Sequence, residues 1–278
     1  MESFVRSEHT HTLHLREWEA MYPGLCAGFT LRTGGHSRPP FSSQNHGLHV
    51  GDDPAEVVAN RRLLTKRLGF PFSSWTCGDQ VHGTKICRVT ADRRGAGREQ
   101  LQEAIPAADG LHTDLSDVLL TSFYADCVPL YFLDPKSSAV GLAHAGWKGT
   151  VGKISSEMVK AFAREYGSDP SKLLVAIGPA IGGCCYQVDG RIVIQVQAAT
   201  ARWSAAVVPD KVEDRYLLDL PLLNELILEE AGVAKERILR TEWCTNCRKD
   251  LFFSHRGEAG KTGRMASFIG WRAEGDVS

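Results

Sequence analysis

The chain has 278 residues, of which 43% are hydrophobic and 23% are charged, and its formal net charge is −1. This composition is typical of a globular protein, and the length is enough for one large domain with a substantial core. The near-zero charge argues against nucleic acid or an anionic membrane as a partner, and no segment approaches the roughly 20 apolar residues of a membrane span.

The first element with clear boundaries is a helix that begins at Asp53-Pro54 and ends at Gly69. It follows residues 28–51, whose many Gly, Ser and Pro residues indicate loops. An acidic residue before the first turn accepts backbone N–H groups, and proline suits the first helical position. Arg61 lies on the apolar face of this helix. It could extend to solvent, pair with a buried carboxylate or reach into a cleft.

Strands and helices then follow one another without a regular alternation. Apolar runs predict strands at 117–124, 128–133, 138–144, 173–177, 238–243 and 268–271, and helical spacing predicts helices at 151–166 and 220–231. This order favours a mixed-sheet α/β or α+β fold over a Rossmann fold, and neither GxGxxG nor a P-loop is present. We therefore predict that residues 1–278 form a single domain of mixed β-sheets flanked by helices.

Three side chains at predicted strand ends or turns are the candidate site: His82, Cys127 and His144. Two imidazoles and a thiolate are good zinc ligands, and three protein ligands leave a fourth position open for water or substrate. A metal-free alternative uses Cys127 as nucleophile and His144 as its base, with Asp79 or Asp126 as the orienting group. The separations along the chain carry no spacing signature, so both hypotheses stay open.

The other cysteines are less informative. The N-terminus has no apolar run typical of a signal peptide, so we expect a cytoplasmic protein with reduced thiols or metal-bound cysteines. Cys244 and Cys247 form a single CxxC without a second pair, which we interpret as structural. Cys184 and Cys185 are adjacent and are interpreted as packing thiols, because neighbours do not easily chelate one ion.

Motifs along nearly the whole chain resemble one known family, the YfiH family, also called the multicopper polyphenol oxidase (laccase-like) or peptidoglycan editing factor family. The motifs are Arg32-Thr33-Gly34-Gly35-His36-Ser37, Gly47-Leu48-His49-Val50-Gly51-Asp52-Asp53, Asn60-Arg61, Gly78-Asp79-Gln80-Val81-His82-Gly83, Ala108-Asp109-Gly110, Ala125-Asp126-Cys127-Val128-Pro129, His144-Ala145-Gly146-Trp147-Lys148-Gly149-Thr150, Ile177-Gly178-Pro179-Ala180-Ile181-Gly182, Phe253-Ser254-His255-Arg256 and Thr262-Gly263-Arg264-Met265. So many motifs in one order make the resemblance specific.

The resemblance implies a YfiH-like fold, similar to that of the cytotoxic necrotising factor cysteine hydrolases. It implies Zn²⁺, with copper as the alternative ion, bound by His82, Cys127 and His144, which would also be the catalytic residues. The activity it implies is phosphorolysis of adenosine, inosine and 5′-methylthioadenosine, with deamination of adenosine as a side activity. Editing of muropeptide precursors and polyphenol oxidation are the other functions attributed to the family.

Chemistry favours some of these activities over others. A laccase needs several copper sites with many histidine ligands, and only one set of three ligands is predicted here. Zinc deaminases carry an HxE…PCxxC signature that this chain lacks. Phosphorolysis needs an anion site, for which Arg32, Arg61 and Lys148 are the candidates, although lysine stands at 148 where arginine is common. His46 likewise stands where an apolar residue is usual.

We therefore predict a zinc-dependent purine nucleoside phosphorylase with adenosine deaminase side activity. The alternatives are a cysteine-histidine amide hydrolase that edits muropeptide precursors, a polyphenol oxidase, or a binding module with structural zinc. The expected partners are a purine nucleoside and phosphate, without nucleic acid or membrane, and we expect a monomer.

Overall fold

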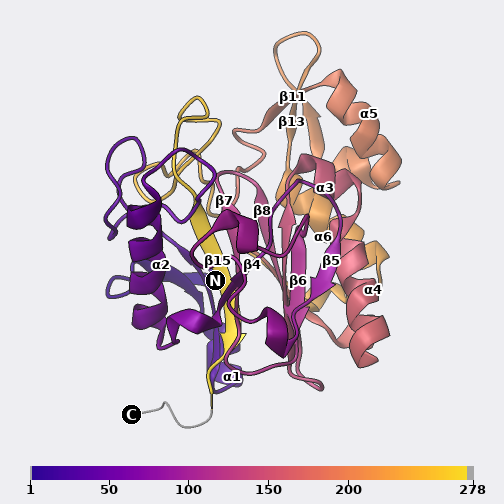
Figure 1. Ribbon diagram of the computed structural model, residues 1–278. Coiled ribbons are helices and arrows are strands. Elements are labelled where there is room, and N and C mark those ends of the chain that lie inside the picture. The colour runs from indigo at the N-terminus through magenta and orange to yellow at the C-terminus, as the bar shows by residue number, and fades with distance from the viewer. Residues whose placement is uncertain (1, 274–278) are drawn as a thin grey trace.

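The computed structural model describes residues 2–273 and contains two six-stranded β-sheets that pack face to face (Figure 1). The strand orders are β1-β2-β3-β15-β7-β4 and β14-β10-β8-β9-β6-β5, and a small third sheet has the order β11-β13-β12. The pairs β4–β7, β5–β6 and β10–β14 are parallel, whereas the other neighbours are antiparallel. The predicted mixed α/β class is therefore confirmed.

The strands of the first sheet are β1 (Phe4–Ser7), β2 (Thr12–Leu15), β3 (Leu25–Thr30), β15 (Met265–Trp271), β7 (Leu119–Tyr124) and β4 (Trp75–Cys77). Those of the second are β14 (Ile238–Arg240), β10 (Leu174–Ile177), β8 (Val128–Asp134), β9 (Ala139–Ala145), β6 (Gly110–Thr113) and β5 (Ile86–Arg88). The third contains β11 (Gln187–Asp189), β13 (Arg215–Leu218) and β12 (Val207–Pro209). The α-helices are α1 (Arg16–Met21), α2 (Pro54–Leu68), α3 (Trp147–Val151), α4 (Ile154–Tyr166), α5 (Gly190–Ala199) and α6 (Leu220–Glu230).

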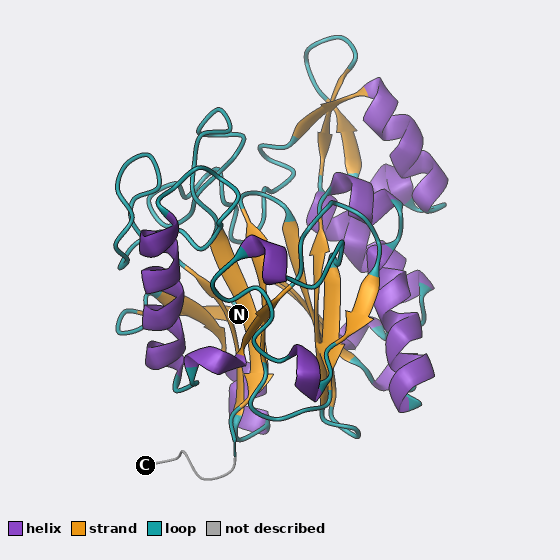
Figure 2. Cartoon of the chain, viewed as in Figure 1, coloured by secondary structure: helices purple, strands orange, loops and turns teal. Residues whose placement is uncertain are grey.

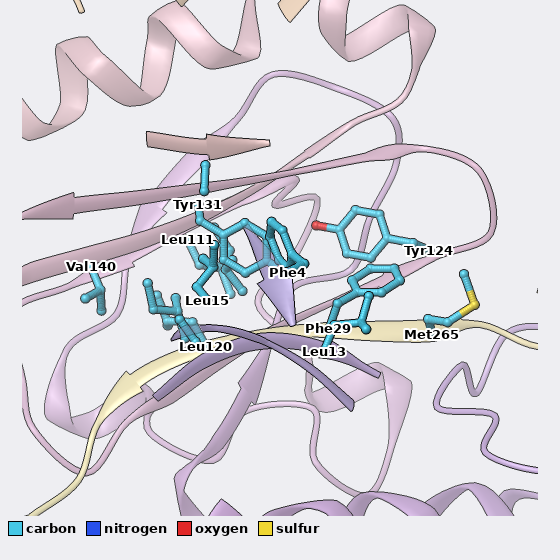
Figure 3. Close-up of a cluster of buried hydrophobic side chains, with 14 of the residues drawn as sticks. Phe4, Leu13, Leu15, Phe29, Leu111, Leu120, Tyr124, Tyr131, Val140 and Met265 are labelled. Carbon is cyan, nitrogen blue, oxygen red and sulfur yellow. The ribbon is translucent and has the colours of Figure 1, made fainter. Parts of the chain in front are cut away.

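The main core fills the space between the two large sheets. Phe29 and Tyr124 of the first sheet lie with Leu111, Tyr131 and Val140 of the second in one buried cluster (Figure 3). Burying each such side chain stabilises the fold by about 1.5–3 kcal/mol. Every residue of β8 and β9 is buried, because helices cover the other face of these strands. Burial on both faces explains why both strands have continuous apolar runs.

Helices form the outer layers on both sides of the sheets (Figure 2). Helices α4 and α6 pack on the second sheet, and α2 packs on the first. The structure confirms the predicted α2, since the Asp53 carboxylate accepts the Ala55 N–H at 2.9 Å and Gly69 ends the helix with φ 74°. No helix within residues 2–273 combines the length and apolarity needed to cross a membrane.

The helix predicted at 151–166 is wrong at its start. The structure instead has the short α3 and then α4, which begins at Ile154. Lys153 has φ 63°, which is not helical, and a Cβ at Gly152 would lie 2.7 Å from Cγ2 of Thr84. This break separates α3 from α4, which packs on β9, and periodicity alone gives no sign of it.

Candidate functional site

The three predicted ligands meet at the end of the second sheet where β8 begins and β9 ends. Cys127 directly precedes β8, His144 lies near the end of β9 opposite Pro129, and His82 lies in the loop after β4. Their ligand atoms all lie within 4.8 Å of one another, and the two imidazole centroids are 4.8 Å apart. Antiparallel pairing of β8 with β9 brings the cysteine and one histidine together, and the loop adds the other histidine.

Asp109 holds this arrangement in place. Its Oδ1 accepts hydrogen bonds from Nδ1 of His144 at 2.8 Å and from the backbone N–H of His82 at 3.0 Å. Its Oδ2 accepts from the backbone N–H groups of Val81 and Gly83 at 3.1 and 2.8 Å. A carboxylate bonded to one ring nitrogen fixes the histidine tautomer and leaves Nε2 for a metal or a proton.

Asp79 and Asp126, the carboxylates predicted from the sequence as orienting groups, do not make the hydrogen bond to Nδ1 of His144. Oδ1 of Asp126 accepts from the Thr245 hydroxyl at 2.6 Å, and Oδ2 accepts from the Ser254 hydroxyl at 3.1 Å and the Arg256 N–H at 2.7 Å. Asp126 thus joins the loop before β8 to the loop between β14 and β15, and Asp109 orients His144. The motif at 108–110 contained the right residue, but only the pairing of β6 with β9 places it beside His144.

The charges in the site favour the cysteine thiolate. Burial opposes ionisation, but His144 and His82 outweigh it and lower the pKa of Cys127 to about 6. Burial likewise opposes the charged imidazole, but Cys127 and Asp109 raise the pKa of His144 to about 9. The thiolate is the form of cysteine that binds metals and attacks electrophiles, so the site supports either chemistry.

A pocket of about 490 Å³ opens next to these side chains. This volume is in the range of small-molecule sites. Aromatic and apolar side chains form part of its wall: Phe123, Ala125, Trp147, Ile181, Tyr186 and Leu220. Polar and charged side chains complete it: His49, Gln80, His82, Asp126, Cys127, His144, His255, Arg256 and Arg264.

The basic side chains in the pocket are not the predicted ones. Arg256 and Arg264 line it, and Arg256 also stacks over Tyr186 at 5.3 Å. Both belong to motifs quoted for the family resemblance. Nothing local distinguished them from other arginines, because loops far from the site in sequence carry them to it.

The three predicted substrate contacts are not among the side chains that line this pocket. Arg61 is 1% exposed and donates to the carbonyl oxygens of His46, Gly97 and Arg98. Arg32 pairs with Glu258 at 3.1 Å and donates to backbone carbonyls. Lys148 is exposed on α3, with its ammonium 5.7 Å from the Trp147 ring. Arg61 and Arg32 hold loops together because their donors are used by the protein itself.

The structure also corrects the interpretation of four cysteines. Cys184, Cys185, Cys244 and Cys247 have sulfur atoms within 4.8 Å of one another, although the sequence suggested unrelated thiols. The amide N–H groups of Cys185 and Tyr186 both donate to the Gly182 carbonyl, and this turn directs both adjacent thiols to one side. A third potential ligand group among the described residues is His14, Glu19 and Cys26.

Known proteins resemble this chain over nearly its whole length. A family model described as multi-copper polyphenol oxidoreductase laccase matches residues 26–272. The "Purine nucleoside phosphorylase YlmD" of Geobacillus stearothermophilus is 47% identical, with 91% of this chain and 92% of that protein covered. The Bacillus subtilis protein of the same name is 43% identical, with 94% and 95% covered.

Two solved structures have the same fold. The crystal structure of YlmD from Geobacillus stearothermophilus superposes with a TM-score of 0.90 at 44% identity, covering 98% of this chain and 100% of that one. The crystal structure of the Bacillus licheniformis hypothetical protein YfiH gives a TM-score of 0.92 at 41% identity, covering 96% and 98%.

Proposed function

The chain belongs to the multi-copper polyphenol oxidoreductase laccase family, which is the YfiH family that its sequence motifs resemble. On that premise we propose that it is a purine nucleoside phosphorylase. The proposed reaction joins phosphate to C1′ of the ribose and breaks the bond from C1′ to the purine nitrogen. The purine nitrogen takes up a proton as the free base leaves, and the other product is the sugar 1-phosphate: ribose 1-phosphate from adenosine or inosine, and its 5-methylthio derivative from 5′-methylthioadenosine. Adenosine, inosine and 5′-methylthioadenosine are the proposed substrates, with deamination of adenosine as a side activity.

The observation that carries this proposal is the joint presence of aromatic and cationic groups in one pocket beside the histidine-cysteine group. Phe123 and Tyr186 contribute aromatic surface to the wall against which a purine would bind. The guanidinium groups of Arg256 and Arg264 retain donors for phosphate besides the Nη1 group that each bonds to backbone carbonyls. The volume of about 490 Å³ is sufficient for both substrates. The names of the relatives given above support the same activity.

The donor set fits Zn²⁺. His82, Cys127 and His144 would hold the ion, since two imidazole nitrogens and one thiolate leave a fourth position open. Bound zinc supplies Lewis-acid polarisation of an oxygen or nitrogen in the pocket. Gly146 lets the chain pass close to this group, because a Cβ there would lie 3.0 Å from Cδ2 of His82 and 3.1 Å from Sγ of Cys127.

The chain's own residues have separable roles in this reaction. Arg256 and Arg264 bind the phosphate and lower the repulsion between its charge and the Cys127 thiolate. His49 lines the same pocket, and burial followed by the nearby Arg264 lowers its pKa to about 4. It is therefore neutral at pH 7 and can exchange a hydrogen bond with substrate without adding charge. Asp109 keeps His144 oriented throughout.

The direct test is base release from inosine by the purified metal-loaded protein, measured by liquid chromatography with and without phosphate. We expect hypoxanthine and ribose 1-phosphate only when phosphate is present, and loss of turnover after treatment with a chelator. Arg256→Met should raise the KM for phosphate about 10–100-fold, the effect of losing a charge-assisted contact. Arg164→Met on the exposed face of α4 is the matched control. Phosphate-independent base release would contradict the proposal.

One observation favours a second candidate, the cysteine-histidine amide hydrolase. The thiol of Cys127, the nucleophile, is hydrogen-bonded to His144, the base, and Nδ1 of His144 is bonded to the orienting carboxylate of Asp109. The pKa of the thiol is lowered to about 6. This function would survive a chelator and form an acyl-enzyme on Cys127 with a muropeptide-like amide. Mass spectrometry of the trapped protein distinguishes the two candidates. Polyphenol oxidation is less favoured, because only one ligand group of the described residues contains two histidines.

A further inference from the structure

A second cluster of metal-ligating side chains lies outside the proposed catalytic pocket. It comprises the four thiols of Cys184, Cys185, Cys244 and Cys247. We propose that these four cysteines bind one structural zinc ion, separate from the ion proposed for the histidine-cysteine group. The cluster joins the loop after β10 to the loop after β14.

The sulfur separations fit a tetrahedral zinc site. The Sγ atoms of Cys184 and Cys247 are 3.6 Å apart, those of Cys185 and Cys247 are 3.4 Å apart, and those of the adjacent cysteines are 3.7 Å apart. Four Zn–S bonds of about 2.3 Å in a regular tetrahedron place the sulfurs about 3.8 Å apart. A disulfide requires about 2.05 Å and uses the sulfurs in pairs. Four thiols within one sphere therefore match a shared ion.

The backbone around the cluster is also that of a metal site. The Gly182 N–H donates to Sγ of Cys244 at 3.3 Å, a contact that stabilises a thiolate. A Cβ at Gly182 would lie 3.2 Å from Sγ of Cys184, so the main chain approaches the sulfurs where a side chain would crowd them. Four thiolates with no cation between them would repel one another, and a tetrahedral all-sulfur set is a preferred environment for Zn²⁺.

The position of the cluster indicates its role. The two loops also contact each other through the backbone, where the Thr245 N–H donates to the Ala180 carbonyl at 3.0 Å. Ile181 and Tyr186, which flank the cluster cysteines on the first loop, line the catalytic pocket. Thr245, on the second loop, bonds to Asp126 beside Cys127. The ion would therefore fix one wall of the pocket, and all four ligand positions are filled by protein, as in structural sites.

The first experiment counts zinc per chain by elemental analysis, on protein produced with zinc and purified under reducing conditions. Cys184→Ser/Cys185→Ser should lower the zinc content by about one equivalent relative to the unsubstituted protein. Cys87→Ser, which removes a half-buried thiol on β5, is the matched control and should leave the content unchanged. An unchanged zinc content in the double variant would overturn the proposal.

The second experiment needs no change in the cluster, so it holds even if the double variant fails to fold. X-ray absorption at the zinc edge of His82→Ala, whose remaining tight site is the cluster, should give four sulfur neighbours at about 2.3 Å. Nitrogen or oxygen neighbours in place of sulfur, iron as the bound metal, or a disulfide seen by intact mass would each overturn the proposal. Neither measurement uses turnover, so failure of the four-cysteine site proposal is distinguishable from failure of the proposed phosphorylase activity.

Discussion

The carboxylate of Asp109 offers the sharpest test of how the proposed catalytic metal is held. Its two oxygens accept four hydrogen bonds, from Nδ1 of His144 and from the backbone N–H groups of three successive residues at 81–83. In Asp109→Asn one oxygen becomes an NH₂ group, so two of the four bonds are lost whichever way the amide turns, as long as His144 keeps its proton on Nδ1 and Nε2 stays free for the metal. Hydrogen bonds to a charged group contribute about 1.5–3 kcal/mol each, so we expect a loss of about 3–6 kcal/mol in unfolding free energy.

The same substitution should weaken zinc binding about 10–100-fold, since the tautomer and orientation of His144 are no longer fixed. Urea unfolding measures the first effect, and competition with a chromophoric chelator measures the second. Asp79→Asn is the matched control, because Asp79 is a half-buried carboxylate on the loop that contains residues 81–83. If Asp109→Asn retained the stability and zinc affinity of this control, the assignment of Asp109 as the orienting group would be refuted.

Three further predictions follow from single contacts. Gly146→Ala places a Cβ 3.0–3.1 Å from His82 and Cys127. Zinc affinity and turnover should therefore fall, while the unfolding free energy changes by about 1 kcal/mol. An unchanged zinc affinity in a chelator competition would contradict this prediction. His46→Leu should raise the unfolding free energy by about 1–2 kcal/mol, measured in urea, because both His46 ring nitrogens are buried without a hydrogen-bond partner among the described residues. The advantage of His46→Leu should also grow on acidification. Burial, then Arg61, lowers the folded pKa of His46 from 6.5 to about 3, so below pH 6.5 the unfolded chain binds a proton that the native protein excludes. Below pH 6.5 the unfolding free energy of the unsubstituted protein therefore falls by about 1.4 kcal/mol per pH unit through this group, whereas that of His46→Leu does not. If the difference in unfolding free energy between His46→Leu and the unsubstituted protein were the same at pH 7.5 and pH 5, a buried neutral imidazole at His46 would be refuted. The control is His9→Leu, at an exposed position.

Local sequence signals predicted the elements with strong periodicity and capping. The helix from Pro54 to Leu68 has an acidic N-cap and a C-terminal glycine, and both function as expected. The apolar runs of β8 and β9 were recognisable because both faces of these strands are buried. The short edge strands β1, β4 and β5 were missed, since three or four residues carry too little pattern to distinguish a strand from a loop.

Sequence reasoning was less successful with charged side chains. Arg61 was a reasonable candidate for a cleft because a charge on an apolar helix face needs a partner. Its partners turned out to be the carbonyl oxygens of two loops, which carry no side-chain signal in the sequence. The sequence did not predict that Arg256 and Arg264 line the pocket, because only the folding of their loop brings them there.

The sequence by itself determined the class of fold, the family, and the residue types available to bind a metal, because these depend on periodicity, composition and ordered motifs. Tertiary structure alone decided which of those residues meet. Asp109 reaches His144 only through the pairing of β6 with β9, and the cysteines at 184–185 and 244–247 meet only because β10 and β14 are neighbours. Contacts between residues far apart in sequence are set by strand order and loop closure, and neither is encoded in local spacing.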